Sequence, residues 1–243
     1  MKLLVSDYDG TFYTDEVNVK KNVNSIRYWM LYGNSFMISS GRSFNSIAKK
    51  LIEHNIPVDY ISTEDGSHLF DRNGNLLFEK NMDKSIINEI DDLKSLNNHD
   101  GIQYGTTYEY YDELPKYKEI SSINFVVRRD KISPKFIKEW DSLKINNAYS
   151  FLVYSYDDIS YFCIKPKGVD KRTPIEYLET SIPILKRNIY TVGDEDNDKT
   201  MVKFYNGYTI GDSTIKNDAL ASYNNIEEII NDIYTKKIKK RFR

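Results

Sequence analysis

Over residues 2–62, two patterns of apolar and polar residues alternate along the chain. Short, uninterrupted apolar runs are typical of strands buried in a parallel sheet. Between them, apolar residues recur every three or four positions, as on one face of a helix. We expect strands at 2–6, 35–39 and 60–62, with helices over 19–31 and around Ile47 and Leu51. This order predicts a parallel sheet with crossover helices.

The pattern changes after this segment. Asn73-Gly74 lies between two short apolar runs and predicts a hairpin. Between about residues 81 and 165, a helical stretch is followed by two strand-like stretches, and the order occurs twice, as in an antiparallel sheet covered by helices on one face. The expected helices cover 84–96 and 134–143, and the expected strands cover 103–111, 122–129, 149–156 and 160–164.

The first pattern returns after residue 166. Helices are expected at 170–178, 196–204 and 226–238, and strands at 188–192 and 207–211. We therefore predict an α/β fold whose core is a Rossmann-like parallel sheet with helices on both faces, built from residues 1–80 and 166–243. Residues 81–165 are predicted to form an inserted α+β domain with an antiparallel sheet.

Composition narrows the class of protein. The chain has 243 residues, of which 40% are hydrophobic and 29% charged, as in soluble globular proteins. The net charge of −2 creates no field that would attract nucleic acid or a membrane, and no apolar run approaches membrane-spanning length. Cys163 is the only cysteine, so an intrachain disulfide is impossible. We expect a cytoplasmic protein with neither a nucleic-acid nor a membrane partner.

The basic run at residues 236–243 is the one exception to this even charge. A helix C-terminus favours such charges through its dipole, and contact with a polyanion is the alternative. Because nothing else in the chain supports a polyanionic partner, we favour the first interpretation.

Two carboxylates follow the first predicted strand. Asp7 and Asp9 are two positions apart, so they would point the same way if the strand stayed extended. Two carboxylates held that close repel each other unless one is protonated or a cation lies between them. An ordinary aspartate-rich turn ending at Gly10 is the alternative.

A second acidic group follows the strand expected at 188–192. Residues 194–198 contain four carboxylates, more than a helix dipole alone calls for, and an oxygen-liganded divalent cation such as Mg²⁺ would explain them. In a parallel sheet, ligands gather beyond the carboxyl ends of the strands. Asp7, Asp9, Ser40 and Asp194 all follow such ends, and we expect them to converge.

Four short motifs in this order resemble those of the haloacid dehalogenase-like (HAD) phosphohydrolases, specifically the Cof-type subfamily with a large α/β cap. The resemblance extends from residue 3 to about residue 230. The motifs are Asp-Tyr-Asp-Gly-Thr at 7–11, Ser-Ser-Gly-Arg at 39–42, Lys-Gly-Val-Asp-Lys at 167–171 and Gly-Asp-Glu-Asp-Asn-Asp at 193–198. The insert at 81–165 would be the cap, which selects the substrate.

The resemblance implies a Mg²⁺-dependent phosphatase of small phosphorylated metabolites, either sugar phosphates or phosphorylated cofactors. Asp7 would attack phosphorus and form an aspartyl-phosphate, and Asp9 would act as general acid and base. Mg²⁺ would be held by Asp7, the backbone carbonyl of Asp9, and Asp194. The resemblance assigns the phosphoryl group to Ser40, Gly41, Lys171 and Asn197. Asn197 and Asp198, without binding the metal themselves, would orient Lys171 and metal-bound water.

Several alternatives stay open. Lys167 competes with Lys171, although the motif spacing favours Lys171. Thr11 and Arg42 are interpreted as supporting residues. Asp65-Gly66-Ser67 stands where relatives usually carry Asn-Gly-Ala, which adds a negative charge near the expected cleft. A phosphosugar mutase would use the same two aspartates, and a binding or regulatory protein on the same core is a further hypothesis.

Overall fold

A computed structural model describes residues 1–91, 96, 98–144 and 149–241. The chain forms two compact units, described separately below. The larger unit comprises residues 1–42, 46–78 and 170–243, and the smaller unit comprises residues 43–45 and 79–169. Among the described residues, no helix is both long enough and apolar enough to cross a membrane.

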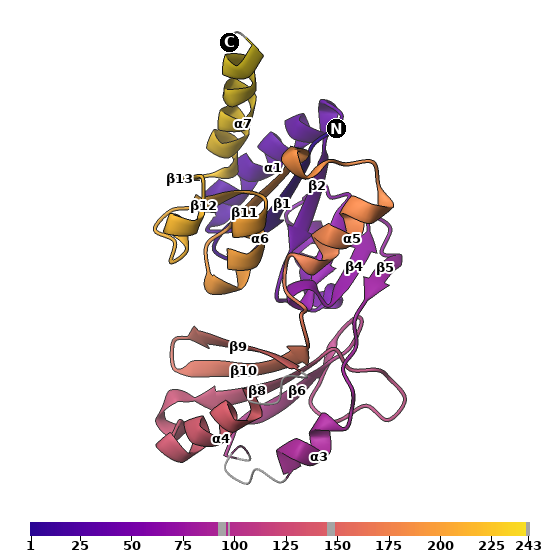
Figure 1. Cartoon of the computed structure of the whole chain (residues 1–243), viewed down its shortest axis with the longest axis vertical. Coiled ribbons are helices and arrows are strands. Elements are labelled where there is room, and N and C mark those ends of the chain that lie inside the picture. Colours follow the sequence, from indigo (N-terminus) through magenta and orange to yellow (C-terminus); the bar gives the residue numbers. More distant parts are fainter. Residues whose placement is uncertain (92–95, 97, 145–148, 242–243) are drawn as a thin grey trace. The chain divides into compact units, whose positions relative to one another are not determined.

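The larger unit contains an eight-stranded sheet (Figure 1). Its strands are β1 (Leu3–Asp7), β2 (Ser35–Ser39), β3 (Tyr60–Thr63), β4 (His68–Asp71), β5 (Leu76–Glu79), β11 (Ile189–Gly193), β12 (Asn206–Ile210) and β13 (Ala221–Tyr223). Their order is β13-β12-β11-β1-β2-β3-β4-β5. All pairs from β13 to β3 are parallel, and β4 runs antiparallel to β3. The expected order of strands and helices is confirmed, while the short strand β13 was missed.

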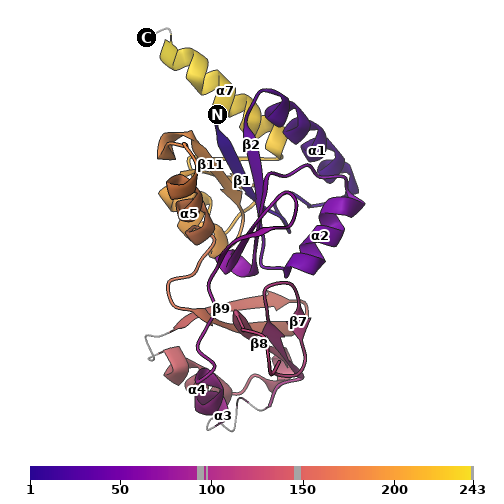
Figure 2. The same cartoon turned by 90° about the vertical axis from the view of Figure 1, so that its right-hand side faces the viewer.

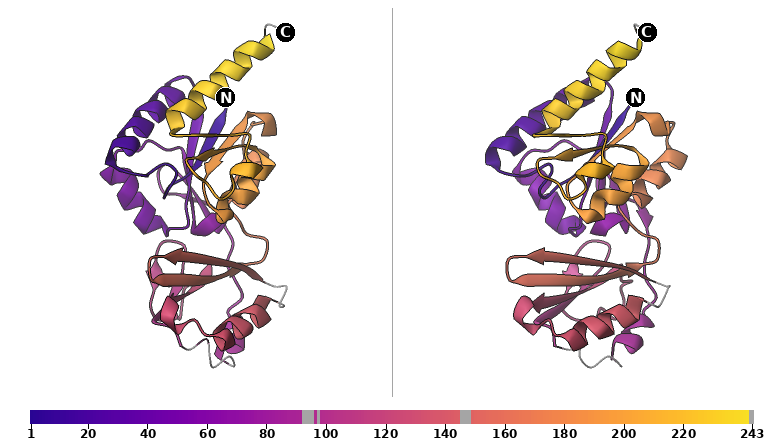
Figure 3. Two further views of the ribbon diagram at one scale, coloured as in Figure 1. Left: turned by 90° about the vertical axis from the view of Figure 1, so that its left-hand side faces the viewer. Right: turned by 60° about the vertical axis from the view of Figure 1, so that its left-hand side comes forward.

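Helices cover both faces of this sheet (Figures 2 and 3). They are α1 (Glu16–Leu31), α2 (Phe44–Glu53), α5 (Thr173–Ser181), α6 (Lys199–Phe204) and α7 (Ile226–Arg241). The views place α1, α2 and α7 on one face and α5 and α6 on the other. Leu3 and Val5 are two positions apart in β1, so their side chains lie on the same face of the sheet. On that face they pack with Ile175 of α5 and Met201 of α6. The predicted fold class is confirmed.

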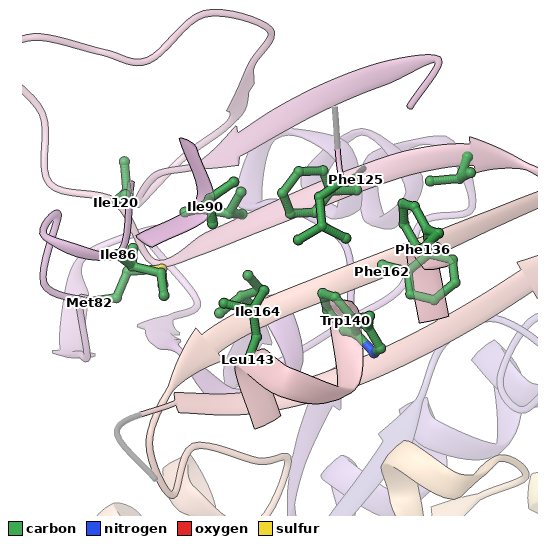
Figure 4. Close-up of a cluster of buried hydrophobic side chains, with 13 residues drawn as sticks. Met82, Ile86, Ile90, Ile120, Phe125, Phe136, Trp140, Leu143, Phe162 and Ile164 are labelled. Atoms are coloured by element: carbon green, nitrogen blue, oxygen red, sulfur yellow. The ribbon is translucent and has the colours of Figure 1, made fainter. Parts of the chain in front are cut away.

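The smaller unit is an antiparallel sheet with two helices. Its elements are α3 (Ile86–Asp91), β6 (Gly101–Gly105), β7 (Tyr110–Tyr111), β8 (Ser122–Arg128), α4 (Pro134–Lys144), β9 (Tyr149–Tyr156) and β10 (Ile159–Pro166). The strand order is β7-β6-β8-β10-β9. Both helices pack on one face, where Ile86 and Trp140 join Phe125, Phe162 and Ile164 in a buried cluster (Figure 4).

One expectation for this unit needs correction, and a second extends beyond the described residues. The single strand expected over 103–111 is two strands, because a turn intervenes in which the N–H of Thr106 donates to the carbonyl of Glu109 at 3.0 Å. The helix expected over 84–96 is observed only at Ile86–Asp91, and residues 92–95 lie outside the described residues. The rest of the helix-strand-strand order is as predicted.

Short 3₁₀ helices complete both units. They are η1 (Glu64–Gly66), η2 (Arg129–Lys131), η3 (Lys186–Asn188), η4 (Asp196–Asp198) and η5 (Lys216–Asp218). Two of them, η1 after β3 and η4 after β11, carry side chains of the site described next.

Candidate active site

The carboxyl ends of four neighbouring strands bring the predicted site residues to one edge of the larger unit. The strands β11, β1, β2 and β3 are adjacent and parallel, so the loops that follow them emerge at the same edge. Asp7 ends β1, Ser40 follows β2, and Asp194 follows β11. The site is therefore assembled from residues far apart in sequence by the parallel order of the strands.

Lys171 lies at the centre of this edge. Its Nζ donates to Oδ1 of Asp7 at 2.6 Å and to Oδ1 of Asp198 at 2.7 Å, and its side chain is only 1% exposed. Lys167, the other lysine of this motif, is exposed. Burial lowers the pKa of Lys171, but the nearby carboxylates, foremost Asp198 and Asp7, raise it more, so the ammonium stays charged.

Asp198 has a second task besides its contact with Lys171. Its Oδ2 accepts the backbone N–H of Asp194 at 3.0 Å and that of Glu195 at 3.3 Å. This side chain is 1% exposed and fixes the start of η4 directly after β11. It thereby sets where the Asp194 backbone lies relative to Lys171.

Asp194 is held against the loop after β1. The hydroxyl of Thr11 donates to its Oδ1. Gly10 has φ +78°, and a Cβ at this position would collide with the Asp194 carboxylate, so glycine is required both by the backbone and by the close approach. Thr11 thus contacts a proposed metal ligand directly.

Three carboxylates come together at this point. Asp7, Asp194 and Asp198 each offer an oxygen, and the three oxygens lie within 4.8 Å of one another. Burial raises the pKa of Asp7 well above its usual range, while Lys171 lowers it and Asp198 raises it further. Burial also raises the pKa of Asp194 to about 6. Crowded, partly buried carboxylates that resist ionisation suit a hard divalent cation, whose charge would stabilise their ionised forms.

Asp9 has a different partner. The strand ends at Asp7 and a turn begins at Tyr8, so the alternation that would have pointed both carboxylates the same way does not extend to Asp9. The Asp9 carboxylate forms a bidentate ion pair with Arg42, with both N–O distances at 2.7 Å. Each of the two aspartates therefore has its own cationic neighbour.

The residues assigned to the phosphoryl group surround the loop after β2. Ser40 is 1% exposed, and its Oγ accepts the backbone N–H of Arg42 at 3.1 Å. Asn197 lies in η4 and donates from Nδ2 to Oδ1 of Asp65 at 3.0 Å. The Asp65 side chain also lies close to Gly41. A Cβ atom added to that glycine would be only 3.2 Å from Oδ1 of Asp65.

Three further residues contact the residues predicted for the site. Arg42 contacts Asp9, Thr11 contacts Asp194, and Asp65 contacts Asn197. Arg42 and Thr11 lie inside the quoted motifs. Asp9 follows one predicted strand and Arg42 follows the neighbouring one, so the sequence does carry a signal that these two charges pair. Asp65 and Asn197 are 132 positions apart, and no local pattern connects them.

Comparison with known proteins identifies the family of the chain. The family model of haloacid dehalogenase-like hydrolases matches residues 4–160 and 111–232. The 5-amino-6-(5-phospho-D-ribitylamino)uracil phosphatase of Bacillus subtilis is 24% identical over 207 residues, covering 84% of this chain and 80% of that protein.

Solved structures share the fold. A haloacid dehalogenase-like hydrolase from B. subtilis superposes with a TM-score of 0.78 at 18% identity, covering 94% of this chain and 96% of that one. A sugar phosphatase of HAD subclass IIB superposes with a TM-score of 0.74 at 15% identity, covering 96% and 99%. At these identities the structural likeness establishes the fold.

Proposed function

The chain belongs to the haloacid dehalogenase-like hydrolases, and from this premise we propose that it is a Mg²⁺-dependent phosphatase of small phosphorylated metabolites. The observation that carries the proposal is the position of Asp7. Its carboxylate lies at the end of β1, receives a hydrogen bond from the buried ammonium of Lys171, and belongs to a cluster of three carboxylates. This arrangement suits a nucleophile that must meet an anionic substrate.

The reaction then proceeds in two displacements. A carboxylate oxygen of Asp7 attacks phosphorus, the bond from phosphorus to the ester oxygen breaks, and Asp9 supplies the proton that the leaving alcohol needs. Asp9 next takes a proton from water as that water attacks the aspartyl-phosphate, which releases inorganic phosphate and restores Asp7. Lys171 neutralises the phosphoryl oxygens throughout.

The metal would be held by Asp7 and Asp194, with the backbone carbonyl of Asp9 as a further ligand and Asp198 beside them. When bound, it supplies positive charge that lets an anionic nucleophile approach an anionic phosphate. The donor set is made of oxygen atoms, which Mg²⁺ prefers. Ser40 and Asn197 contribute neutral hydrogen-bonding groups, and Gly41 a backbone without a side chain, to the phosphoryl group.

The larger unit offers no explanation of how one phosphate ester is chosen over another. All residues proposed to act on the phosphoryl group lie in that unit, and every phosphate ester offers them the same group. We propose that residues 81–165 act as the cap and select the leaving alcohol. Sugar phosphates and phosphorylated cofactors are the first candidates, together with polyol phosphates like the substrate named for the B. subtilis relative.

A phosphate-release screen over such esters tests the proposal. The full chain should release inorganic phosphate with Mg²⁺ and stop when a chelator is added, and Asp7→Asn should be inactive under both conditions. Conversion of a substrate into a phosphorylated isomer without phosphate release would indicate a mutase instead. A chain that binds metabolites but transforms none of them would indicate a binding protein.

A further inference from the structure

Asp65 is fixed in an unusual backbone conformation beside the proposed phosphate-binding residues. Glu64, Asp65 and Gly66 have φ angles of +48°, +50° and +102°, so three consecutive residues lie in the left-handed region. The N–H of Asp65 donates to the carbonyl of Ser40 at 3.0 Å, and that of Glu64 donates to the carbonyl of Arg42 at 3.0 Å. The loop after β3 is thus tied to the loop after β2.

The same segment is packed against the loop that carries Lys171. A Cβ on Gly66 would overlap the backbone carbonyl of Asp170, so only glycine permits this approach. Asp65 is consequently held between two loops of the site, and the residue is only 1% exposed. Its carboxylate has little freedom to leave.

The Asp65 carboxylate lies among the groups proposed to bind phosphate. Its Oδ1 accepts a hydrogen bond from Nδ2 of Asn197 at 3.0 Å and lies close to Gly41. Its charge also acts on Lys171, after the larger effects of burial and of the two carboxylates that Lys171 contacts. Three of the four groups assigned to the phosphoryl group therefore have an anion of the protein itself as a neighbour.

We propose that Asp65 weakens the binding of phosphate to this site and so promotes release of the inorganic phosphate product. The inference rests on the proposed function. A phosphoryl group enters against the negative charge of Asp65, and it must share both Asn197 and the positive potential of Lys171 with that carboxylate. A phosphate ester carries a charge of about −1.5 to −2 at pH 7 and inorganic phosphate is also an anion, so this repulsion weakens the binding of both, and for the product weaker binding means faster release.

One substitution removes the charge of Asp65 without removing the contacts that hold its loop in place. Asn has the same shape, its amide oxygen can accept the hydrogen bond from Asn197, and it tolerates a positive φ better than most residues. The backbone hydrogen bond to Ser40 does not depend on the side chain. Asp65→Asn therefore removes the charge while keeping the loop.

The test measures phosphate affinity as well as activity. In the full chain with Mg²⁺, inorganic phosphate is titrated by calorimetry, and its inhibition constant is measured against a small aryl phosphate. For Asp65→Asn we expect phosphate to bind about tenfold more tightly, as follows from removing one nearby charge in a partly buried site. The KM for the aryl phosphate should fall, and kcat should change less than KM or decrease as product release slows.

A matched control removes the same charge elsewhere. Asp71 ends β4 opposite Tyr60 at the start of β3, whereas Asp65 follows the end of that strand, so Asp71→Asn should leave phosphate affinity unchanged. If Asp65→Asn does not fold, as judged by thermal unfolding, Asp65→Gly provides a second variant, because glycine adopts positive φ freely.

Suppose that the parent hydrolyses esters normally but a folded variant without the Asp65 charge binds phosphate no more tightly. This result would overturn the inference and leave the proposed function intact. A parent chain that neither hydrolyses phosphate esters nor binds phosphate would overturn the proposed function, and the role of Asp65 with it.

Discussion

The guanidinium of Arg42 holds both carboxylate oxygens of Asp9, from Nε to Oδ2 and from Nη2 to Oδ1, each at 2.7 Å. A planar fork facing a carboxylate fixes its orientation as well as its position. The Arg42 and Asp9 side chains are 37% and 43% exposed, so the pair stays accessible to a substrate. Because Asp9 is the proposed acid and base, Arg42 is placed to orient a group that must move protons.

The first prediction follows from this geometry. Arg42→Lys keeps the positive charge but cannot contact both oxygens in the same fixed fork. We expect kcat for a small aryl phosphate to fall about tenfold, because misplacing a catalytic group by about 1 Å can cost up to about 10²-fold. Arg27→Lys, on the exposed side of α1, makes the same exchange and should leave kcat unchanged. Parental kcat in Arg42→Lys would show that Asp9 needs no such orientation.

The second prediction separates the two aspartates of the opening motif. Asp7→Asn lacks the nucleophile, so no phosphorylated protein should accumulate in rapid-quench experiments. Asp9→Asn keeps the nucleophile and loses an acid and base that typically contributes about 10²–10⁴-fold. It should still bind Mg²⁺, since its proposed ligand is a backbone carbonyl. Turnover by Asp7→Asn near the parental rate would exclude a covalent mechanism through this residue.

The third prediction concerns the cation. Asp7, Asp194 and Asp198 offer hard oxygen ligands at close range, so hydrolysis should require Mg²⁺ and stop in a chelator. Calcium should support it poorly, because Ca²⁺ takes a larger and more flexible shell of ligands. Asp194→Asn should raise the Mg²⁺ concentration needed for half-maximal activity. Full activity after exhaustive metal removal would contradict the site.

The fourth prediction uses the pKa of Asp194, which burial raises to about 6. The pKa of an unfolded aspartate is about 3.9, so the folded, metal-free protein holds the proton of the Asp194 carboxyl more tightly than the unfolded chain does. The stability that this proton contributes to the folded state is lost as pH rises through about 6. A divalent cation binds the ionised form. The increase in Tm that Mg²⁺ produces should therefore be larger at about pH 7.5 than at about pH 5. In Asp194→Asn the increase should be smaller and should depend less on pH, and a parental pH dependence in this variant would show that other groups govern it.

The placement of the site was predictable because it depends on buried strands. Uninterrupted apolar runs identify β1, β2 and β11 in the sequence, and the order of elements makes them parallel neighbours. Once that is known, Asp7, Ser40 and Asp194 must emerge at one edge. The start of α1 was less predictable, because it is set by a cap. Asp15 accepts the N–H groups of Val17 and Asn18, which starts the helix before its first apolar residue of helical spacing.

The partners of the side chains were much less predictable. The Asp9 and Asp7 side chains would point the same way only if the strand continued to Asp9. A turn begins at Tyr8 instead, and the apolar pattern of the strand does not predict it. The contact of Asp65 with Asn197 joins two loops that are adjacent only in the folded sheet. The break between β6 and β7 was missed because Thr106 to Glu109 contains no glycine, proline or asparagine, and only the preceding Gly105 marks the turn.

The last prediction concerns residues 81–165. Each unit has its own buried cluster, which includes Trp140 in the smaller unit and Leu3 in the larger one, so the larger unit keeps its core when the insert is removed. The residues proposed for phosphate and metal also stay. Replacing 81–165 by a short Gly/Ser linker should therefore leave slow, Mg²⁺-dependent hydrolysis of a small aryl phosphate, with Asp7→Asn in the same background as the inactive control.

What the shortened chain should lose is choice among substrates. Phosphate and metal contacts are the same for every ester, so discrimination has to come from groups that meet the leaving alcohol, and the insert is the largest segment without a part in the chemistry. The kcat/KM values for a panel of sugar, polyol and cofactor phosphates should become nearly equal, and all should fall, because the proposed cap, which would also exclude water, is gone. If the shortened chain folds and ranks these esters as the parent does, then the larger unit itself recognises the alcohol, and the assignment of specificity to the insert is wrong.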